Sequence, residues 1–158
     1  MIFATLGTQK FQFLRMLKMI DELVSDGTIE EPVVAQIGYT DYKTDNYKCL
    51  SIIPEQEFQK YVAEASVIIT HSGSGALFSS IKQGKKIIAV ARLKKYNEMV
   101  DDHQTELVKK LTSEGYIIDG TASLREAWNQ LDSFTPRKYD FLNTIVEVIS
   151  NWIDNDLI

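Results

Sequence analysis

The segment from Val67 to Phe78, VIITHSGSGALF, places His71 and a serine–glycine repeat directly after an apolar run. Two hydroxyls and two glycines, Ser72-Gly73-Ser74-Gly75, then lead into another apolar stretch. The first backbone N–H groups of a helix have no partner inside the helix, and the helix dipole adds positive charge there. Glycine lets an anion approach the backbone closely. A strand that ends here and a helix that begins here would form an anion site suited to a diphosphate.

The same residues also fit a tight strand-to-helix turn that binds no ligand. The third glycine of the dinucleotide-binding fingerprint is missing, because the spacing from Gly75 puts Phe78 there. His71 has two interpretations as well: a structural hydrogen-bonding residue at a strand end, or a donor to a phosphate or sugar oxygen. It is the only candidate for a catalytic side chain in this segment.

A second group of polar residues, Asp101-Asp102-His103-Gln104, is predicted to open the helix after the next strand. Carboxylate and amide groups bind sugar hydroxyls well. The alternative is a capping aspartate followed by solvated residues. The loop before it carries Arg92, Lys94 and Lys95, which fit a solvated surface, a phosphate contact, or docking to a partner or an anionic membrane face.

Strand-like and helix-like segments alternate along the whole chain, which predicts a parallel sheet covered on both faces. Strands are expected at Ile2–Leu6, Pro32–Gly38, Leu50–Ile53, Ser66–Thr70, Lys86–Ala91 and Tyr116–Ile118. The helices between them carry apolar residues at helical spacing, Ser123 with Glu126 forms a capping box, and a last helix is expected at about 139–153. The fold class is therefore α/β, a doubly wound Rossmann-like sheet. Ligands of such sheets bind beyond the carboxyl ends of the strands, where Gly7, Gly38 and Gly73 fall.

Length and composition limit the classes of protein that the chain can belong to. Its 158 residues fit one domain, 1–158, and the net charge of −5 argues against a nucleic-acid-binding protein. The single cysteine, Cys49, cannot form an internal disulfide, which favours a reducing compartment. No run is long enough to cross a bilayer, and the first residues do not read as a signal peptide. We expect a cytoplasmic chain, unless a partner holds it at a membrane.

Taken together, the motifs resemble the carboxyl-terminal domain of glycosyltransferase family 28. The pattern is H-x-G-x-G at His71 to Gly75, then Gly84-Lys85 and a strand, a basic loop, and D-H-Q at Asp102 to Gln104. The opening LGTQKFQFLRML is also similar to that of the family, with Gly7, Thr8, Phe13 and Arg15 in place and Met16 where leucine is usual. The resemblance extends from Ile2 to about Ile118. It is strongest to the small separate subunits of the family, which act in dolichol-linked sugar transfer and in bacterial capsule and exopolysaccharide synthesis.

The resemblance implies a domain equivalent to the carboxyl-terminal half of a GT-B glycosyltransferase, with a UDP-sugar as substrate and no separate cofactor. Gly7, Thr8 and the residues from His71 to Gly75 would line the diphosphate, and Asp102, His103 and Gln104 would face the sugar. The reaction implied is inverting transfer of a hexose to a lipid-diphosphate-linked acceptor. The helix start at Ser74, with Arg92 or a neighbouring lysine, would stabilise the UDP leaving group.

The resemblance also implies a membrane-associated partner subunit that holds the lipid-linked acceptor. Such a partner would place this chain at the inner face of the membrane and supply the general base, for which no residue here is obvious. The last helix is expected to pack on this domain, with docking to the partner as the alternative. A chain of this length fits a donor half, because a two-domain enzyme needs roughly twice as many residues.

Two positions depart from the family, and one motif matches in letters only. The family commonly has an acid for the ribose hydroxyls where this chain has Ser79, and a proline where it has Ala91. A hydroxyl forms weaker hydrogen bonds than a carboxylate, so a weakened donor site or another residue in that role is expected. This departure keeps open a non-catalytic enhancer subunit and a nucleotide-binding regulatory module. Asp154-Asn155-Asp156 reads as solvated tail charge, and no metal site is predicted.

Overall fold

The computed structural model describes residues 1–139. The predicted helix at about 139–153 and the segment Asp154-Asn155-Asp156 therefore fall outside the described residues. Within them, six strands form one sheet in the order β3-β2-β1-β4-β5-β6, and every neighbouring pair is parallel. The strands are β1 (Ile2–Thr5), β2 (Val33–Gln36), β3 (Lys48–Leu50), β4 (Val67–His71), β5 (Lys86–Val90) and β6 (Ile118–Asp119).

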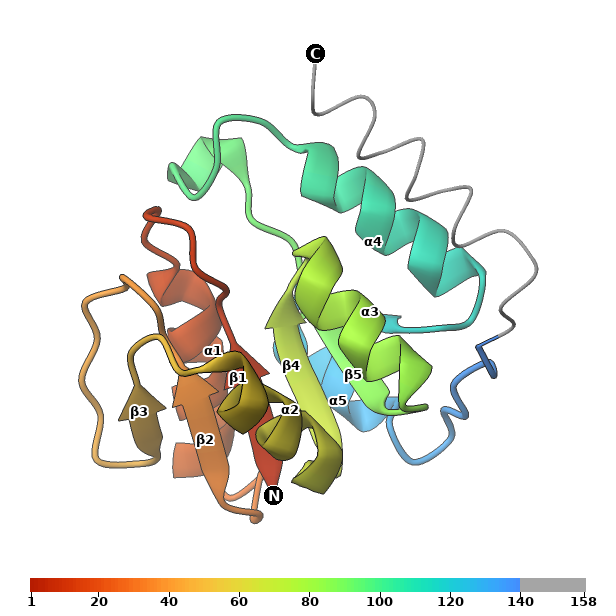
Figure 1. Ribbon diagram of the computed structural model, residues 1–158, viewed down its shortest axis with the longest axis horizontal. Helices are drawn as coiled ribbons and strands as arrows, with labels where there is room; N and C mark the ends of the chain where they lie inside the picture. Colours follow the sequence, from red (N-terminus) through yellow and green to blue (C-terminus); the bar gives the residue numbers. More distant parts are fainter. Residues whose placement is uncertain (140–158) are drawn as a thin grey trace.

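Helices cover both faces of this sheet (Figure 1). Five α-helices and one 3₁₀ turn occur in residues 1–139: α1 (Leu14–Ser25), α2 (Glu55–Glu64), α3 (Ser74–Lys82), the 3₁₀ turn η1 (Lys94–Tyr96), α4 (His103–Ser113) and α5 (Leu124–Asn129). Helices α1 and α5 pack on one face, and α2, α3 and α4 pack on the other. The predicted fold class, a doubly wound Rossmann-like sheet, is confirmed.

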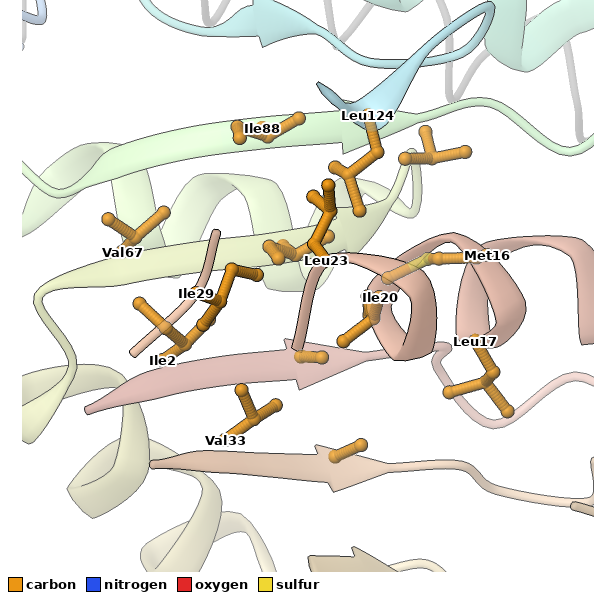
Figure 2. Close-up of a cluster of buried hydrophobic side chains, with 14 of the residues drawn as sticks. Ile2, Met16, Leu17, Ile20, Leu23, Ile29, Val33, Val67, Ile88 and Leu124 are labelled. Carbon is orange, nitrogen blue, oxygen red and sulfur yellow. The ribbon is translucent and has the colours of Figure 1, made fainter. Parts of the chain in front are cut away.

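The alternation of side chains along each strand divides the core into two layers. Ile2 and Ala4 of β1 point toward α1 and α5, whereas Phe3 between them points toward the opposite helices. Figure 2 shows the first layer, in which Ile20 and Leu23 of α1 lie over the strands. Because the central strands are buried on both faces, their sequences are apolar at nearly every position.

Two of the predicted strands were placed wrongly. The third strand was expected at Leu50–Ile53, but β3 ends at Leu50, where its pairing with Gln36 of β2 also ends. Ile52 is 43% exposed and belongs to the following loop. The last strand was expected at Tyr116–Ile118, but only Ile118 and Asp119 pair with β5. Both are short edge strands, whose bounds depend on the neighbouring strand more than on local apolarity.

Two further observations concern the predicted organisation of the chain. Among residues 1–139, no helix has the length and apolarity needed to span a bilayer. Ser123 caps α5 as predicted, since its hydroxyl accepts the backbone N–H of Glu126. The assignment of residues 1–158 to a single domain stays a prediction.

Candidate functional site

Several of the residues with predicted chemistry meet where the strand order reverses, between β1 and β4. The chain leaves β1 toward α1 on one face and leaves β4 toward α3 on the other, so a crevice forms beyond the carboxyl ends of the two strands. A cavity of about 400 Å³ opens there. Six of the predicted site residues line it: Gly7, Thr8, His71, Gly73, Ser74 and Gly75.

His71 is the last residue of β4, and two glycines make room for its ring. A Cβ atom on Gly73 would lie 2.0 Å from Nε2 of His71, and one on Gly7 would lie 2.5 Å from the same nitrogen. Gly7 also has a φ of +73°, which a residue with a side chain rarely adopts. These two glycines are therefore required by the histidine itself, whether or not a ligand is bound.

The hydrogen bonding of His71 defines which ring nitrogen is available to a ligand. Nδ1 lies 3.3 Å from the backbone oxygen of Thr5, and because a carbonyl oxygen only accepts, Nδ1 carries the hydrogen. Burial and the positive charge of Arg92 lower the pKa of His71 to about 4, and these effects outweigh the contact with Thr5. The ring is neutral at pH 7, and Nε2 is a hydrogen-bond acceptor. Nε2 can therefore accept a hydrogen bond from a hydroxyl, but it carries no hydrogen to donate to a phosphate oxygen.

The start of α3 presents backbone N–H groups to the cavity. Gly73 is the N-cap residue, and no side chain caps the helix in its place. Ser74, Gly75 and Ala76 of the first turn all line the cavity. A Cβ atom on Gly75 would meet nothing within 4 Å, so this glycine is not explained by protein packing. Uncapped N–H groups at a helix start are suited to bind an anion.

Ser72 differs from its neighbours in the glycine turn. Its side chain is 2% exposed and does not line the cavity. Within residues 1–139, its hydroxyl has no hydrogen-bond partner. The structure therefore does not bring Ser72 together with the other predicted diphosphate contacts.

Arg92 is fully buried and does not line the cavity. Its guanidinium lies 4.7 Å from the ring centroid of Phe13 and donates to three backbone oxygens, those of Leu6 (2.7 Å), Phe11 (3.0 Å) and Glu98 (3.3 Å). Burial lowers the pKa of Arg92 to about 10, although the charge of Glu98 opposes this change, so Arg92 stays charged at neutral pH. Arg92 thus fixes the loops after β1 and β5, and its predicted contact with a phosphate stays a prediction.

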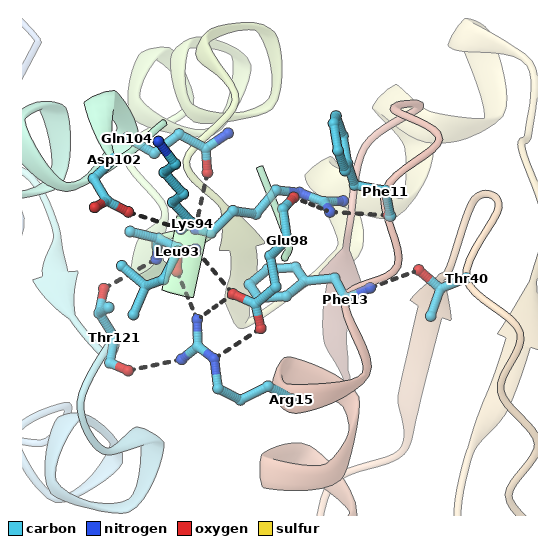
Figure 3. Close-up of polar contacts among 12 residues, drawn as sticks. Phe11, Phe13, Arg15, Thr40, Leu93, Lys94, Glu98, Asp102, Gln104 and Thr121 are labelled. Carbon is cyan, nitrogen blue, oxygen red and sulfur yellow. Dashed lines mark hydrogen bonds and ion pairs between the residues drawn. The ribbon is translucent and has the colours of Figure 1, made fainter. Parts of the chain in front are cut away.

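An ion pair between Arg15 of α1, 20% exposed, and Glu98, 5% exposed, joins α1 to the loop after β5 (Figure 3). Both guanidinium nitrogens that face Glu98 bond to its carboxylate, at 2.9 and 2.8 Å. Arg15 also donates to the backbone oxygens of Ala91 and Thr121. Glu98 was not among the predicted residues, although one acid in a basic loop is a signal of such a pair. Arg15, which carried part of the family resemblance, is thus a structural residue.

The group Asp102, His103 and Gln104 also lies outside the cavity lining. Gln104 is 5% exposed, and its side-chain oxygen accepts the backbone N–H of Arg92 at 3.0 Å. Asp102 accepts the backbone N–H of Lys94 at 2.8 Å (Figure 3). His103 is exposed at the start of α4. Asp102 and Gln104 hold the loop after β5 in place, and their predicted contact with a sugar stays a prediction.

Ser79 connects two helices and does not line the cavity. Its hydroxyl donates to the side-chain oxygen of Gln59 at 2.7 Å, and the amide nitrogen of Gln59 donates to Glu55 at 2.6 Å. Glu55, Phe58 and Gln59 of α2 do line the cavity, and sequence reasoning missed all three as site residues. They follow β3, whose carboxyl end lies at the same sheet edge. Their position after a strand end could have indicated that they belong to the site.

The chemistry of the cavity is mostly neutral. Its lining contains one acidic side chain, that of Glu55, and no lysine or arginine. Across residues 1–139, no three His, Cys, Asp or Glu side chains gather where they would hold a metal ion. The arrangement offers backbone N–H groups, one imidazole acceptor and one carboxylate, a set that fits a ligand with both an anionic group and hydroxyls.

Comparison with known proteins identifies relatives at low identity. The protein UDP-N-acetylglucosamine transferase subunit ALG13 of Mus musculus is 21% identical over 129 residues, which are 73% of this chain and 10% of that protein. The human protein of the same name is 23% identical over 123 residues, again 73% of this chain and 10% of the relative. This chain therefore spans about a tenth of the length of these two relatives.

Solved structures with the same fold include several glycosyltransferases. An NMR structure of ALG13 has a TM-score of 0.58 at 13% identity and covers 96% of this chain and 93% of that chain. SnogD from Streptomyces nogalater (TM-score 0.57, 20% identity) covers 82% of this chain and 33% of that chain. MurG from Acinetobacter baumannii (TM-score 0.52, 24% identity) covers 84% of this chain and 40% of that chain.

The sequence model of the glycosyltransferase family 28 C-terminal domain matches residues 1–139, the same part of the chain that carries the cavity. The match and the GT-B fold of the neighbouring structures agree with the resemblance seen in the motifs. This chain belongs to the glycosyltransferase family 28 C-terminal domain family.

Proposed function

We propose that this chain is the donor-binding catalytic subunit of a two-chain inverting glycosyltransferase. It moves a hexose from a UDP-sugar to a lipid-diphosphate-linked acceptor in surface polysaccharide synthesis. One observation carries this proposal: the cavity at the β1–β4 crevice contains an uncapped helix start with an open glycine, Gly75. The names of the ALG13 relatives, which are UDP-N-acetylglucosamine transferase subunits, support a UDP-sugar as the donor.

The residues of the cavity have separate roles in this reaction. The N–H groups at Ser74 and Gly75 stabilise the negative charge that develops on the UDP leaving group. The buried positive charge of Arg92 acts in the same direction without touching the ligand. His71, neutral and with Nε2 as an acceptor, binds a hydroxyl of the donor. We propose that the partner supplies the general base, because His71 is almost fully buried between Gly7 and Gly73.

The proposal includes a membrane-associated partner that carries the acceptor site. The ALG13 relatives are named as subunits of a transferase, which supports a second chain. Transfer also requires an acceptor hydroxyl held opposite the donor, and the donor cavity described here lies at one edge of a single sheet. A partner that holds a lipid-linked acceptor would bring this chain to the inner face of the membrane.

The second candidate function is a non-catalytic enhancer subunit with the same fold and partner. Ser79 favours it, because this position lacks the carboxylate that the family commonly uses, and its hydroxyl is engaged with Gln59. The two functions differ in the effect of Gly75→Ala on a reconstituted pair of chains. The change should lower transfer about tenfold or more if this chain binds the donor, and should leave transfer unchanged if it is an enhancer.

The experiment that tests the proposal is thermal unfolding of the purified chain with UDP, ADP and a panel of UDP-sugars. A ligand at a hundred times its dissociation constant stabilises the folded state by about 2.7 kcal/mol, which should raise Tm by roughly 5–10 °C. We expect a shift for UDP and for one UDP-sugar, none for ADP, and the same shifts with EDTA present. No shift with any uridine nucleotide would contradict a donor-binding role.

A further inference from the structure

We propose that Glu55 binds the two adjacent hydroxyls of the nucleotide ribose, and that Ser79 and Gln59 position its carboxylate. This inference rests on the proposed function, since it assigns a part of the same nucleotide site. It also accounts for the departure at Ser79: the acid of this site is on α2, and Ser79 on α3 acts through it.

The contacts that carry the inference form a short relay between two helices. The hydroxyl of Ser79 donates to Oε1 of Gln59 at 2.7 Å, which fixes the orientation of that amide. The amide nitrogen of Gln59 then donates to Oε1 of Glu55 at 2.6 Å. Gln83 also donates to Oε1 of Gln59, at 3.3 Å. One oxygen of the carboxylate is thus held by the protein at the cavity wall.

The cavity has surfaces for the three parts of a nucleoside diphosphate. Ile53 and Phe58 supply apolar surface for a base, and the first turn of α3 supplies N–H groups for a diphosphate. Glu55 and Gln59 supply the polar side-chain groups of the wall formed by α2. The ribose connects the base to the diphosphate, so its hydroxyls would face this pair.

A carboxylate is the side chain best suited to a pair of adjacent hydroxyls. It accepts at both oxygens, and hydrogen bonds to a charged acceptor are roughly twice as strong as those between neutral groups. A serine hydroxyl at position 79 could offer only neutral hydrogen bonds, and it already donates to Gln59. Glu55 is the one carboxylate among the residues that line the cavity.

The test is the selectivity of the full chain for UDP over 2′,3′-dideoxy-UDP, measured by calorimetric titration. We expect the unaltered chain to bind UDP about ten- to a hundredfold more tightly than the dideoxy compound. Glu55→Ala should reduce this ratio to about threefold or less by weakening the binding of UDP alone. Glu57→Ala is the matched control, because it removes the other acid of the same helix turn and Glu57 does not line the cavity.

A second variant separates positioning from direct contact. Ser79→Ala breaks the relay without removing the carboxylate, so its selectivity ratio should lie between those of the unaltered chain and Glu55→Ala. A loss of folding alone would weaken both nucleotides equally and leave the ratio unchanged. If Glu55→Ala keeps the full ratio, the role of Glu55 is wrong while the proposed function stands. If the unaltered chain binds neither nucleotide, the proposed function fails and this inference fails with it.

Discussion

At the scale of single residues, the main feature is a histidine buried in its neutral form at the wall of the cavity. The unfolded chain protonates His71 near its ordinary pKa of 6.5, whereas burial and Arg92 hold the folded pKa at about 4. The stability that depends on neutral His71 is therefore fully present above pH 6.5 and is lost as the pH falls from 6.5 toward 4. The pKa difference corresponds to about 3 kcal/mol across that range.

We predict that His71→Asn flattens the dependence of stability on pH. The measurement is the free energy of unfolding in urea at several pH values between 7.5 and 4.5. The unaltered chain should lose stability more steeply than the variant, because asparagine does not titrate. His103→Asn removes an exposed histidine and is the control. Equal slopes for His71→Asn and the unaltered chain would show that the buried ring is not the cause.

At the scale of elements, Gly73 and Gly75 in the turn between β4 and α3 differ in why a side chain is unfavourable there. A Cβ atom on Gly73 would overlap the ring of His71, so Gly73→Ala should lower the free energy of unfolding by about 1–3 kcal/mol. Gly75 lies inside α3 with open space around it, so Gly75→Ala should keep the fold or stabilise it by up to about 1 kcal/mol.

In Gly75→Ala, UDP binding should weaken although the stability of the fold is kept or increased. A methyl group there occupies the space in front of the helix start, so we expect UDP binding to weaken about tenfold or more in Gly75→Ala. Urea unfolding and calorimetric titration of both variants check the two effects separately. A Gly75→Ala chain that binds UDP as tightly as the unaltered chain would show that the diphosphate does not sit at this turn.

The sequence predicts the order of the elements because the central strands and their helices carry strong apolar patterns. Such patterns place β1, β4 and β5 to within a residue or two of their ends. They fail for β3 and β6, since Ile52 and Tyr116 are apolar but do not pair with a neighbouring strand. Pairing at a sheet edge is a property of the assembled sheet, and a local pattern does not contain it.

The candidate site is predictable from the sequence only where backbone geometry forms it. The turn from His71 to Gly75 could be found because glycine spacing next to a strand end has a direct structural meaning. The inward direction of Arg92 and Gln104 could not, because charged and amide side chains are mostly exposed. Their partners include the backbone oxygens of Leu6 and Phe11, which are more than 80 residues away in the sequence. Contacts at that separation exist only in the folded chain.

At the scale of the whole molecule, the cavity that we propose binds the donor lies at one edge of a single sheet. Inverting transfer requires a donor and an acceptor on opposite sides of the reacting carbon, with a base beside the acceptor hydroxyl. We therefore predict that the purified chain binds a UDP-sugar but transfers none of it to a lipid-diphosphate-linked sugar in detergent micelles. Co-expression with the proposed membrane-associated partner should restore transfer, and Gly75→Ala in the pair should lower it again by about tenfold or more. Binding is measured by titration and transfer by release of UDP and by the mass of the lipid product. Turnover by the chain alone would contradict this division, because it would mean that the acceptor site and the base both lie within these 158 residues.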